Sequence, residues 1–234
     1  TKINGFFDIA SINKRNLFRY VIENNSLNFL SSEKNFKGEV NFKPFYFSTD
    51  LNFNYISQKK IFQSESLLID LLDSELLNNP NLNASINIKI DKIDKFEYLQ
   101  DFVSKIHLGD GRILMKNFNT QWNNSVLIES NEIEFINDID GKKLVGEIIF
   151  NFEDIEKFFR YFQIKRNYRD VFESIKLDFI YDLTLDKVTL NNLRIDNKSF
   201  KRIDKFLNQY NKGQYNSFNK VTIRNFIKEF FKIY

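Results

Sequence analysis

The chain has 234 residues, of which 42% are hydrophobic and 28% are charged, so it holds enough apolar material for one large domain or two small ones. Its 34 basic and 31 acidic residues leave a net charge of +3, which is too balanced to predict nucleic acid as a partner of the whole chain. The absence of cysteine excludes disulfides, thiolate metal ligands and thiol catalysis.

The aromatic content is high, with 27 Phe and 10 Tyr beside only 7 Gly and 2 Pro. Because AT-rich codons encode Phe, Tyr, Ile, Asn and Lys, we interpret this skew as the mark of a low-GC genome rather than of aromatic chemistry. The sequence contains no run of about 18 uncharged apolar residues, so no segment is predicted to cross a bilayer as a helix. The chain starts with Thr1, which we interpret as a fragment or a processed product.

Residues 1–61 are predicted to form strands. Five segments have strand composition or alternation, namely LFRYVIE, SLNFL, KGEVNF, PFYF and DLNFNYI. Pro44 indicates an edge or a bulge within this run. Residues 64–78, with the sequence SESLLIDLLDSELLN, are predicted to form a short helix that has four leucines on one stripe and Pro80 just beyond its end.

The middle of the chain returns to strand periodicity. LNASINIKIDKI places three isoleucines on one face, and a short helix is expected around residues 96–102. Three further strands are predicted in GDGRILMKNF, SVLIESNEIEFI and KKLVGEIIFNF, with turn residues at Asp110–Gly111 and in NDIDG. Residues 153–163 are predicted to form a helix because Ile155, Phe158, Phe159 and Phe162 recur at helical spacing.

The stretch ESIKLDFIYDLTLDKVTLNNLRID alternates between apolar and polar residues at almost every step. Successive side chains of a strand point to opposite faces, so this alternation predicts a half-buried strand, a turn near LDKV and a return strand. One face carries Ile175, Leu177, Phe179, Tyr181, Leu183 and Leu185, followed by Val188 and Leu190 on the return strand. Something must cover this apolar face, and the protein itself, a partner and a lipid are the three candidates.

The C-terminal tail is predicted to form two basic amphipathic helices. Residues 198–234 contain nine Lys or Arg against two acids, so the basic surplus of the chain lies here. In the second helix an aromatic stripe faces away from the basic residues, which is typical of a helix that packs on a sheet or lies on an anionic membrane. The candidate membrane or partner surface consists of Arg224, Phe226, Lys228, Phe230, Phe231 and Lys232.

No pattern of residues indicates catalysis or a bound metal, and we expect no cofactor. His107 is the only histidine and is interpreted as a structural residue near a strand end. DIDG, residues 138–141, begins like a calcium loop but lacks a later acid at the required spacing, so a hairpin turn is favoured. Trp122 is interpreted as a sheet-surface or core aromatic in preference to a carbohydrate platform.

The order of elements from Leu144 to Asp196 resembles the C-terminal region of AsmA-like proteins of the Gram-negative envelope. A strand, an aromatic helix, the pattern I-x-L-x-F and a return strand that ends in NLRI carry this resemblance, which is best over about residues 111–197. The resemblance implies an α+β, strand-dominated fold in which an extended, curved antiparallel sheet forms an apolar groove. Residues 1–197 would form this groove region and residues 198–234 the helical tail.

The resemblance also implies a function in moving phospholipid toward the outer membrane, from the periplasmic side of the cell envelope, with an inner-membrane anchor upstream. The partners would be phospholipid acyl chains and, at the tail, a membrane surface or an envelope protein. Carried onto this sequence, the groove residues are Ile148, Phe150, Ile175, Leu177, Phe179, Tyr181, Leu183, Val188 and Leu190.

Two alternatives stay open. The first is a structural or outer-membrane assembly protein of the same envelope, whose sheet is closed by its own helices and holds no ligand. The second is a glycan-processing enzyme, which would need two carboxylates facing each other across a cleft beside Trp122.

Overall fold

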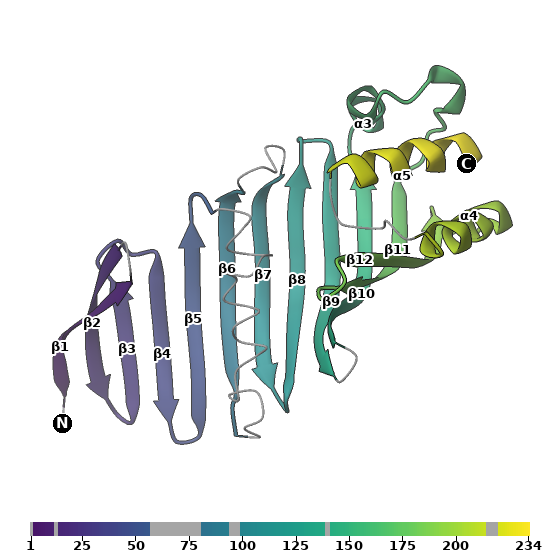
Figure 1. Cartoon of the computed structure of the whole chain (residues 1–234). Coiled ribbons are helices and arrows are strands. Elements are labelled where there is room, and N and C mark those ends of the chain that lie inside the picture. The colour runs from purple at the N-terminus through teal and green to yellow at the C-terminus, as the bar shows by residue number, and fades with distance from the viewer. Residues whose placement is uncertain (1, 12–13, 57–80, 94–98, 139–140, 214–219) are drawn as a thin grey trace. The chain divides into compact units, whose positions relative to one another are not determined.

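The computed structural model describes residues 2–11, 14–56, 81–93, 99–138, 141–213 and 220–234. Within these ranges twelve strands form one open sheet, in which each strand lies beside its predecessor and its successor in the chain (Figure 1). The predicted strand-dominated α+β fold with a C-terminal helical pair is confirmed. The helix expected at residues 64–78 falls outside the described residues.

The first six strands are β1 (Ile3–Ser11), β2 (Lys14–Glu23), β3 (Ser26–Ser31), β4 (Phe36–Phe42), β5 (Phe45–Phe53) and β6 (Ala84–Lys92). The next six are β7 (Leu99–Gly109), β8 (Arg112–Trp122), β9 (Val126–Asp138), β10 (Gly141–Phe152), β11 (Ser174–Asp182) and β12 (Lys187–Ile195). The described helices are α3 (Ile155–Phe162), the short 3₁₀ helix η2 (Arg166–Tyr168), α4 (Lys201–Asn211) and α5 (Lys220–Ile233). None of them is long and apolar enough to cross a bilayer.

The chain divides into two compact units. Unit 1 consists of Thr1–Glu97 with Asp101–Lys116, and unit 2 consists of Tyr98–Gln100 with Asn117–Tyr234. Unit 2 therefore contains both C-terminal helices, and the limit expected between residues 197 and 198 lies inside it.

From β1 to β5 each strand pairs antiparallel with the next one, and the same holds from β9 to β12, as predicted. The exception lies in unit 1, where β6 pairs with β5 in parallel, with Phe47 opposite Ala84 and Phe53 opposite Ile90. The connection between these strands is long enough for the crossover that a parallel pair requires. The antiparallel pairs are joined by short connections, except that α3 and η2 lie between β10 and β11.

Tight turns at asparagine and aspartate set the register of several hairpins. Asn24 and Asn25, between β2 and β3, have φ values of 51° and 64°. Asp110 and Gly111, between β7 and β8, have φ values of 53° and 71°, which confirms the turn predicted there. Two consecutive positive φ angles match the right-handed twist of the flanking strands, and Asn and Asp tolerate them better than other non-glycine residues.

Three local assignments differ from the expectation. Strand β1 was not anticipated, and β7 already begins at Leu99, within the helix expected at 96–102. Strand β11 ends at Asp182, because the Asp182 carboxylate accepts hydrogen bonds from the backbone N–H groups of Thr184 (2.9 Å) and Leu185 (2.8 Å). The alternation extends past the strand, so Leu183 and Leu185 belong to a turn instead of to the sheet.

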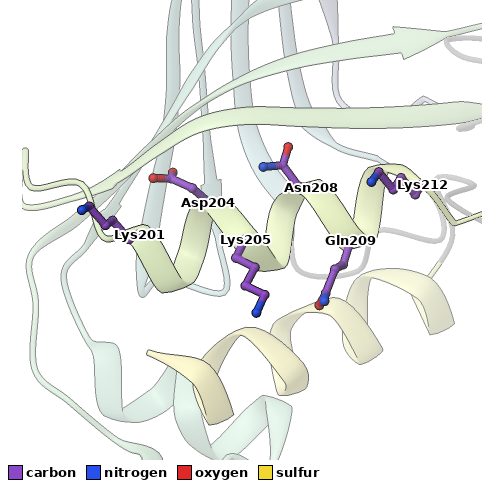
Figure 2. Close-up of a pocket in the computed structure, with 6 residues that line it drawn as sticks. All are labelled: Lys201, Asp204, Lys205, Asn208, Gln209 and Lys212. Atoms are coloured by element: carbon purple, nitrogen blue, oxygen red, sulfur yellow. The ribbon is translucent and has the colours of Figure 1, made fainter.

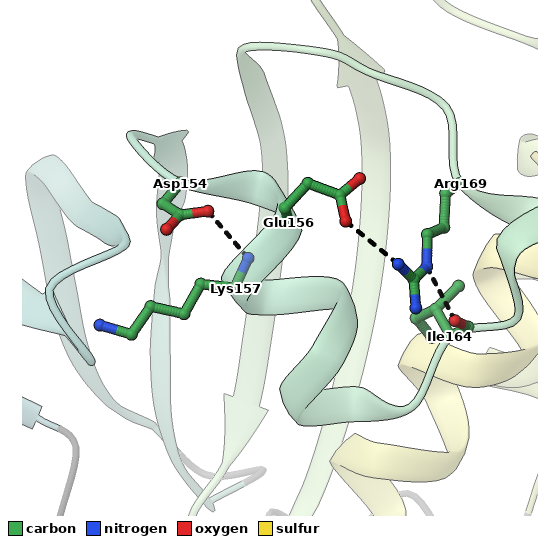
Figure 3. Close-up of polar contacts among 5 residues, drawn as sticks. All are labelled: Asp154, Glu156, Lys157, Ile164 and Arg169. Carbon is green, nitrogen blue, oxygen red and sulfur yellow. Dashed lines mark hydrogen bonds and ion pairs between the residues drawn. The ribbon is translucent and has the colours of Figure 1, made fainter.

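Helix α3 forms as predicted for residues 153–163. The Asp154 carboxylate caps its first turn by accepting a hydrogen bond from the Lys157 N–H at 2.8 Å (Figure 3). After the helix, the Arg169 guanidinium donates to the Ile164 carbonyl at 2.9 Å and pairs with Glu156 at 3.1 Å. These contacts hold the chain that leads from α3 to β11.

Three helices cover one face of the β10–β12 part of the sheet and form the core of unit 2. Phe159 of α3 is completely buried, and its ring lies 5.2 Å from that of Phe231 in α5. Ile203 and Leu207 of α4 belong to the same cluster. The apolar stripes of α3, α4 and α5 therefore serve as the cover that this part of the sheet needs.

Candidate functional site

One face of strands β1 to β5 carries a row of phenylalanine side chains. The rings of Phe7 and Phe18 stack at 5.0 Å, those of Phe18 and Phe29 lie 6.1 Å apart, and those of Phe29 and Phe47 lie 6.3 Å apart. Such offset or edge-on ring pairs are favourable beyond the area that they bury. We call this surface the aromatic face, and it consists of Phe7, Phe18, Phe29, Phe36, Phe47 and Phe53.

Strand register extends the aromatic face with aliphatic side chains. Leu27 lies opposite Val40, Phe36 opposite Leu51, and Leu51 opposite Ile88. The other side of the same strands carries polar residues, and there the Asn87 amide donates to the Asp50 carboxylate at 2.7 Å. The sheet of unit 1 therefore has one apolar face and one mixed face, on which Leu17 and Leu30 are exposed among polar residues.

The aromatic face is only partly buried. Phe18 is buried, but the other five phenylalanines keep part of their surface accessible. The described part of unit 1 contains strands and turns, so no described helix of this unit packs over these rings. This contrasts with unit 2, where three helices close the apolar face.

Two polar side chains on the aromatic side, Ser31 and Thr49, are satisfied within the protein. The Thr49 hydroxyl donates to the Lys37 carbonyl at 2.8 Å, and the Ser31 hydroxyl donates to the Asn35 side chain, also at 2.8 Å. Because both hydroxyls already have acceptors, they do not require polar groups from a ligand. The face can therefore accept an apolar ligand without stranding a buried polar group.

Gly38 allows the ring of Phe29 to lie across β4. A Cβ atom at this position would stand 2.2 Å from Cζ of Phe29, which is far inside van der Waals contact. The ring thus occupies the space that a side chain at position 38 would fill. Gly38 thus lets the ring of Phe29, from β3, reach across β4 to within 6.3 Å of the ring of Phe47, from β5.

The residues expected to line a groove in unit 2 are mostly in its core. Ile175 and Leu177 are buried, and four others pack partly buried against the same cluster, namely Ile148, Phe150, Phe179 and Leu190. Helices α3, α4 and α5 contribute to this cluster, so an acyl chain cannot reach Ile175 or Leu177 in this conformation. Tyr181 and Val188 lie opposite each other near the turn, outside the cluster, and Leu183 lies in the turn itself.

Tyr181 is a half-buried phenol on this sheet. Its hydroxyl donates a hydrogen bond to the Asp186 carboxylate at 2.8 Å. Burial is the largest cause that raises the pKa of Tyr181 above its ordinary value, and the hydrogen bond and the negative charge of Asp186 raise it further. The phenol therefore stays neutral, and its hydrogen bond to Asp186 stabilises the β11–β12 turn.

We expect Tyr181 to ionise well above pH 10, the ordinary value of a tyrosine. The difference between near-ultraviolet alkaline titrations of the wild type and Tyr181→Phe isolates this group among the ten tyrosines. Asp186→Asn should lower the pKa of Tyr181. Since the folded pKa is the higher one, the stabilisation is complete below about pH 10 and is lost as the pH rises toward the folded pKa. A difference curve centred at the ordinary value, with the fold intact, would contradict the assignment.

The aromatic residues of the tail surface are also in the core of unit 2. Phe230 and Phe231 are buried, and the ring of Phe226 lies 4.8 Å from Tyr210 and 5.4 Å from Phe206 of α4. The two predicted helices are therefore confirmed, and the aromatic stripe of α5 is not available to a membrane in this conformation.

The basic residues of the tail remain on the outside. Lys228 is partly exposed, and Lys232 is exposed and pairs with Glu229. Arg224 differs, because its side chain is only partly exposed and its Nε is buried without a hydrogen-bond partner. Figure 2 shows the polar side of α4, where a hollow is lined by Lys201, Asp204, Lys205, Asn208, Gln209 and Lys212. This side of unit 2 could contact anionic groups through charge without inserting apolar side chains.

Trp122 packs inside unit 2. Its ring stacks on Phe162 at 5.6 Å and meets Tyr161 edge-on at 4.9 Å, both from α3. These contacts agree with a core aromatic. A carbohydrate platform would instead need an exposed ring face.

His107 and the DIDG segment lie in local structure near turns. His107 is in β7, close to the Asp110–Gly111 turn, and it lines a hollow with Phe45 and Asn83. Asp138 ends β9 opposite Gly141, which has a φ of 118°, while Asp140 falls outside the described residues. Among the described residues no three His, Asp or Glu side chains are placed to hold a metal ion.

The sequence interpretation placed the apolar groove between Leu144 and Asp196 and did not assign a site to the aromatic face. Strand β5 carries the alternation that predicts an apolar face. In this strand polar residues alternate with Phe47, Thr49, Leu51 and Phe53. Only the register, however, shows that the rings of five strands form one surface.

Comparisons of this chain with protein-family models, with curated proteins and with solved structures find no match. The functional assignment therefore depends on the residues themselves.

Proposed function

We propose that this chain binds phospholipid acyl chains on the aromatic face of unit 1 and acts as a lipid-binding or lipid-transfer part of an AsmA-like envelope protein. The observation that carries the proposal is an apolar face that spans β1 to β6, with five phenylalanine rings still partly accessible and with the buried hydroxyls of Ser31 and Thr49 satisfied internally. Leaving such a surface to water is unfavourable, and an acyl chain is a natural cover for it.

The energetics require no polar recognition. Each methylene that leaves water contributes about 0.8 kcal/mol, so eight methylenes in contact contribute about 6 kcal/mol before the cost of ordering the lipid. A surface of this kind discriminates little between headgroups, while its affinity rises with the number of methylenes in contact. The proposed work is transfer without bond cleavage, so it needs no catalytic residue and no cofactor.

The resemblance of residues 111–197 to AsmA-like proteins supports a place in the Gram-negative cell envelope. Under this proposal the chain works on the periplasmic side, held at the inner membrane by a segment upstream, and contributes to outer-membrane lipid homeostasis. The exposed lysines of α4 would contact the anionic headgroups of a membrane surface, because a basic residue near such a surface contributes about 1 kcal/mol.

The rival function is a structural or assembly protein of the same envelope. The closed core of unit 2, in which the expected groove residues pack under α3, α4 and α5, favours this rival. The two functions differ in one measurable quantity, which is the lipid bound to the folded protein.

The test is to purify the chain, quantify the phospholipid that co-purifies with it and compare charge substitutions on the two faces of the sheet. Phe29→Asp places a carboxylate on the aromatic face and is expected to weaken binding of a fluorescent phospholipid at least tenfold. Leu30→Asp is the matched control, because Leu30 is exposed on the opposite face of the same strand. Phe53→Asp with its neighbour Asn52→Asp provides a second pair of variants should Phe29→Asp fail to fold.

A wild-type chain that carries no lipid and does not bind the probe would establish the structural rival. A folded Phe29→Asp protein with its full lipid load would show that the aromatic face is not the site. Co-sedimentation with anionic and neutral vesicles at low and high salt tests α4, since binding through its lysines must weaken in salt and with neutral lipid.

A further inference from the structure

Two exposed phenylalanines mark the end of unit 1 at which β4 leads into β5. Phe42 and Phe45 lie opposite each other, on either side of the turn at Lys43 and Pro44, and are 47% and 44% exposed. Phe45 is on the same side of β5 as Phe47, because one residue separates them. The aromatic face therefore continues to this end of the sheet, and there its rings are most accessible.

A polar hollow lies beside the same end of unit 1. Here β4 and β7 end while β5 and β6 begin (Figure 1). The hollow has a volume of about 470 Å³, and Phe45 borders it together with the polar residues Asn83, His107 and Asp110. All of these residues belong to unit 1. Phe45 thus borders both the aromatic face and the hollow.

The polar side chains of the hollow are available to a ligand. Among the described residues, the side chains of Asn83, His107 and Asp110 make no hydrogen bond or ion pair. Gly109 leaves room for the imidazole, since a Cβ atom there would stand 3.1 Å from Nε2 of His107. The buried hydroxyls farther along the aromatic face are already hydrogen-bonded. Free polar groups therefore meet the aromatic face at this end.

We propose that the hollow holds the headgroup of a phospholipid whose acyl chains lie along β4 and β5 on the aromatic face. The lipid reaches the hollow past Phe45, round the end of β5. An acyl chain spans about 15 Å, half of a bilayer core, which corresponds to about five residues of a strand. The nine residues of β5 are long enough to hold it. This inference rests on the proposed lipid binding and adds the place and the chemistry of the headgroup.

The charge of the hollow favours a headgroup that carries a primary ammonium. Among the described residues that line the hollow, Asp110 is the only Asp, Glu, Lys or Arg. Its carboxylate accepts hydrogen bonds from an ammonium group, while the His107 imidazole and the Asn83 amide can donate to the adjacent phosphate. An ethanolamine headgroup provides both partners. A glycerol headgroup places its phosphate near Asp110 without an ammonium to offset the repulsion.

The first test compares the binding of two fluorescent phospholipids, with identical acyl chains and with ethanolamine or glycerol headgroups, to the full chain. We expect the ethanolamine lipid to bind about tenfold more tightly, the effect of one hydrogen bond to a charged group. Asp110→Asn should remove this preference, and the turn should survive because Asn tolerates the φ of 53°. Asp101→Asn is the matched control, since Asp101 is exposed, has a φ of 54° and lies near the other end of β7.

The second test determines the orientation of the lipid and needs no change at Asp110. The chain has no cysteine, so Lys43→Cys and Asn54→Cys each provide a single site for a fluorophore. These sites flank β5 and are roughly 30 Å apart, at about 3.3 Å per residue. A nitroxide on the lipid headgroup should quench the label at position 43 more strongly than the label at position 54.

The outcomes separate this inference from the proposed function. A wild-type chain that binds neither lipid would refute both. Equal affinity for the two headgroups, a preference that Asp110→Asn retains, or equal quenching of the two labels would overturn the headgroup site while acyl-chain binding stands. Glycerophosphoethanolamine, which lacks acyl chains, should compete weakly. Competition as strong as that of the lipid would assign the hollow to a soluble ligand and would also overturn the inference.

Discussion

Replacing Phe159 by alanine is expected to lower the free energy of unfolding of unit 2 by about 3–5 kcal/mol. Phe159 is fully buried beneath α5, its ring meets that of Phe231 edge-on, and the Arg169 guanidinium lies 5.8 Å from its centre. The cavity left by the ring cannot collapse easily, because sheet and helices enclose it. A loss of this size is a large share of the roughly 5–15 kcal/mol that stabilises a typical domain.

Trp122 provides the measurement, because it is the only tryptophan and packs against Phe162 of the same helix. Urea unfolding followed by its fluorescence reports on the cluster that Phe159 joins. Val171→Ala, at an exposed position of unit 2, should leave the midpoint within experimental error. If Phe159→Ala unfolds at the wild-type midpoint, the three helices do not close this core as described.

Asn211→Ala is expected to expose the β12 edge of the sheet and to promote aggregation. The substitution removes both hydrogen bonds that the Asn211 side chain, from α4, makes with the backbone of Leu190, and it frees the β12 edge. A free β12 edge presents unpaired backbone N–H and C=O groups, which can pair with a strand of another chain and so promote aggregation. We expect light scattering to rise with concentration for this variant and to stay low for the wild type.

Asn208→Ala is the control for this prediction, because Asn208 is exposed on the same helix and lies on the hollow of α4. A soluble Asn211→Ala protein whose size equals that of the wild type would show that the amide does not guard the edge.

Local patterns in the sequence were sufficient to predict most elements. The alternation in Ser174–Asp182 gave β11, and the spacing of Phe158, Phe159 and Phe162 gave α3, because side-chain periodicity follows directly from backbone geometry. The alternation did not show where β11 ends. That limit depends on the Asp182 carboxylate, which captures two backbone N–H groups and turns the chain.

The sequence interpretation also did not predict the tight turn between β2 and β3. The pair Asn24–Asn25 performs the role that glycine has in most hairpins, in a chain with only 7 glycines. Asn–Asn is a weaker turn signal than Asn–Gly, so this turn was not predicted, although the two strands that it joins were.

Which apolar face is covered was decided by tertiary structure alone. The pattern of β11 shows that Ile175 and Leu177 need a cover, but a lipid, a partner and a helix satisfy that need equally well in sequence terms. Burial is non-directional, so an apolar stripe does not specify its partner. The fold places α3, α4 and α5 over the apolar face of unit 2 and leaves the rings of unit 1 partly accessible. It also sets the Asn211 amide against the β12 edge of the sheet.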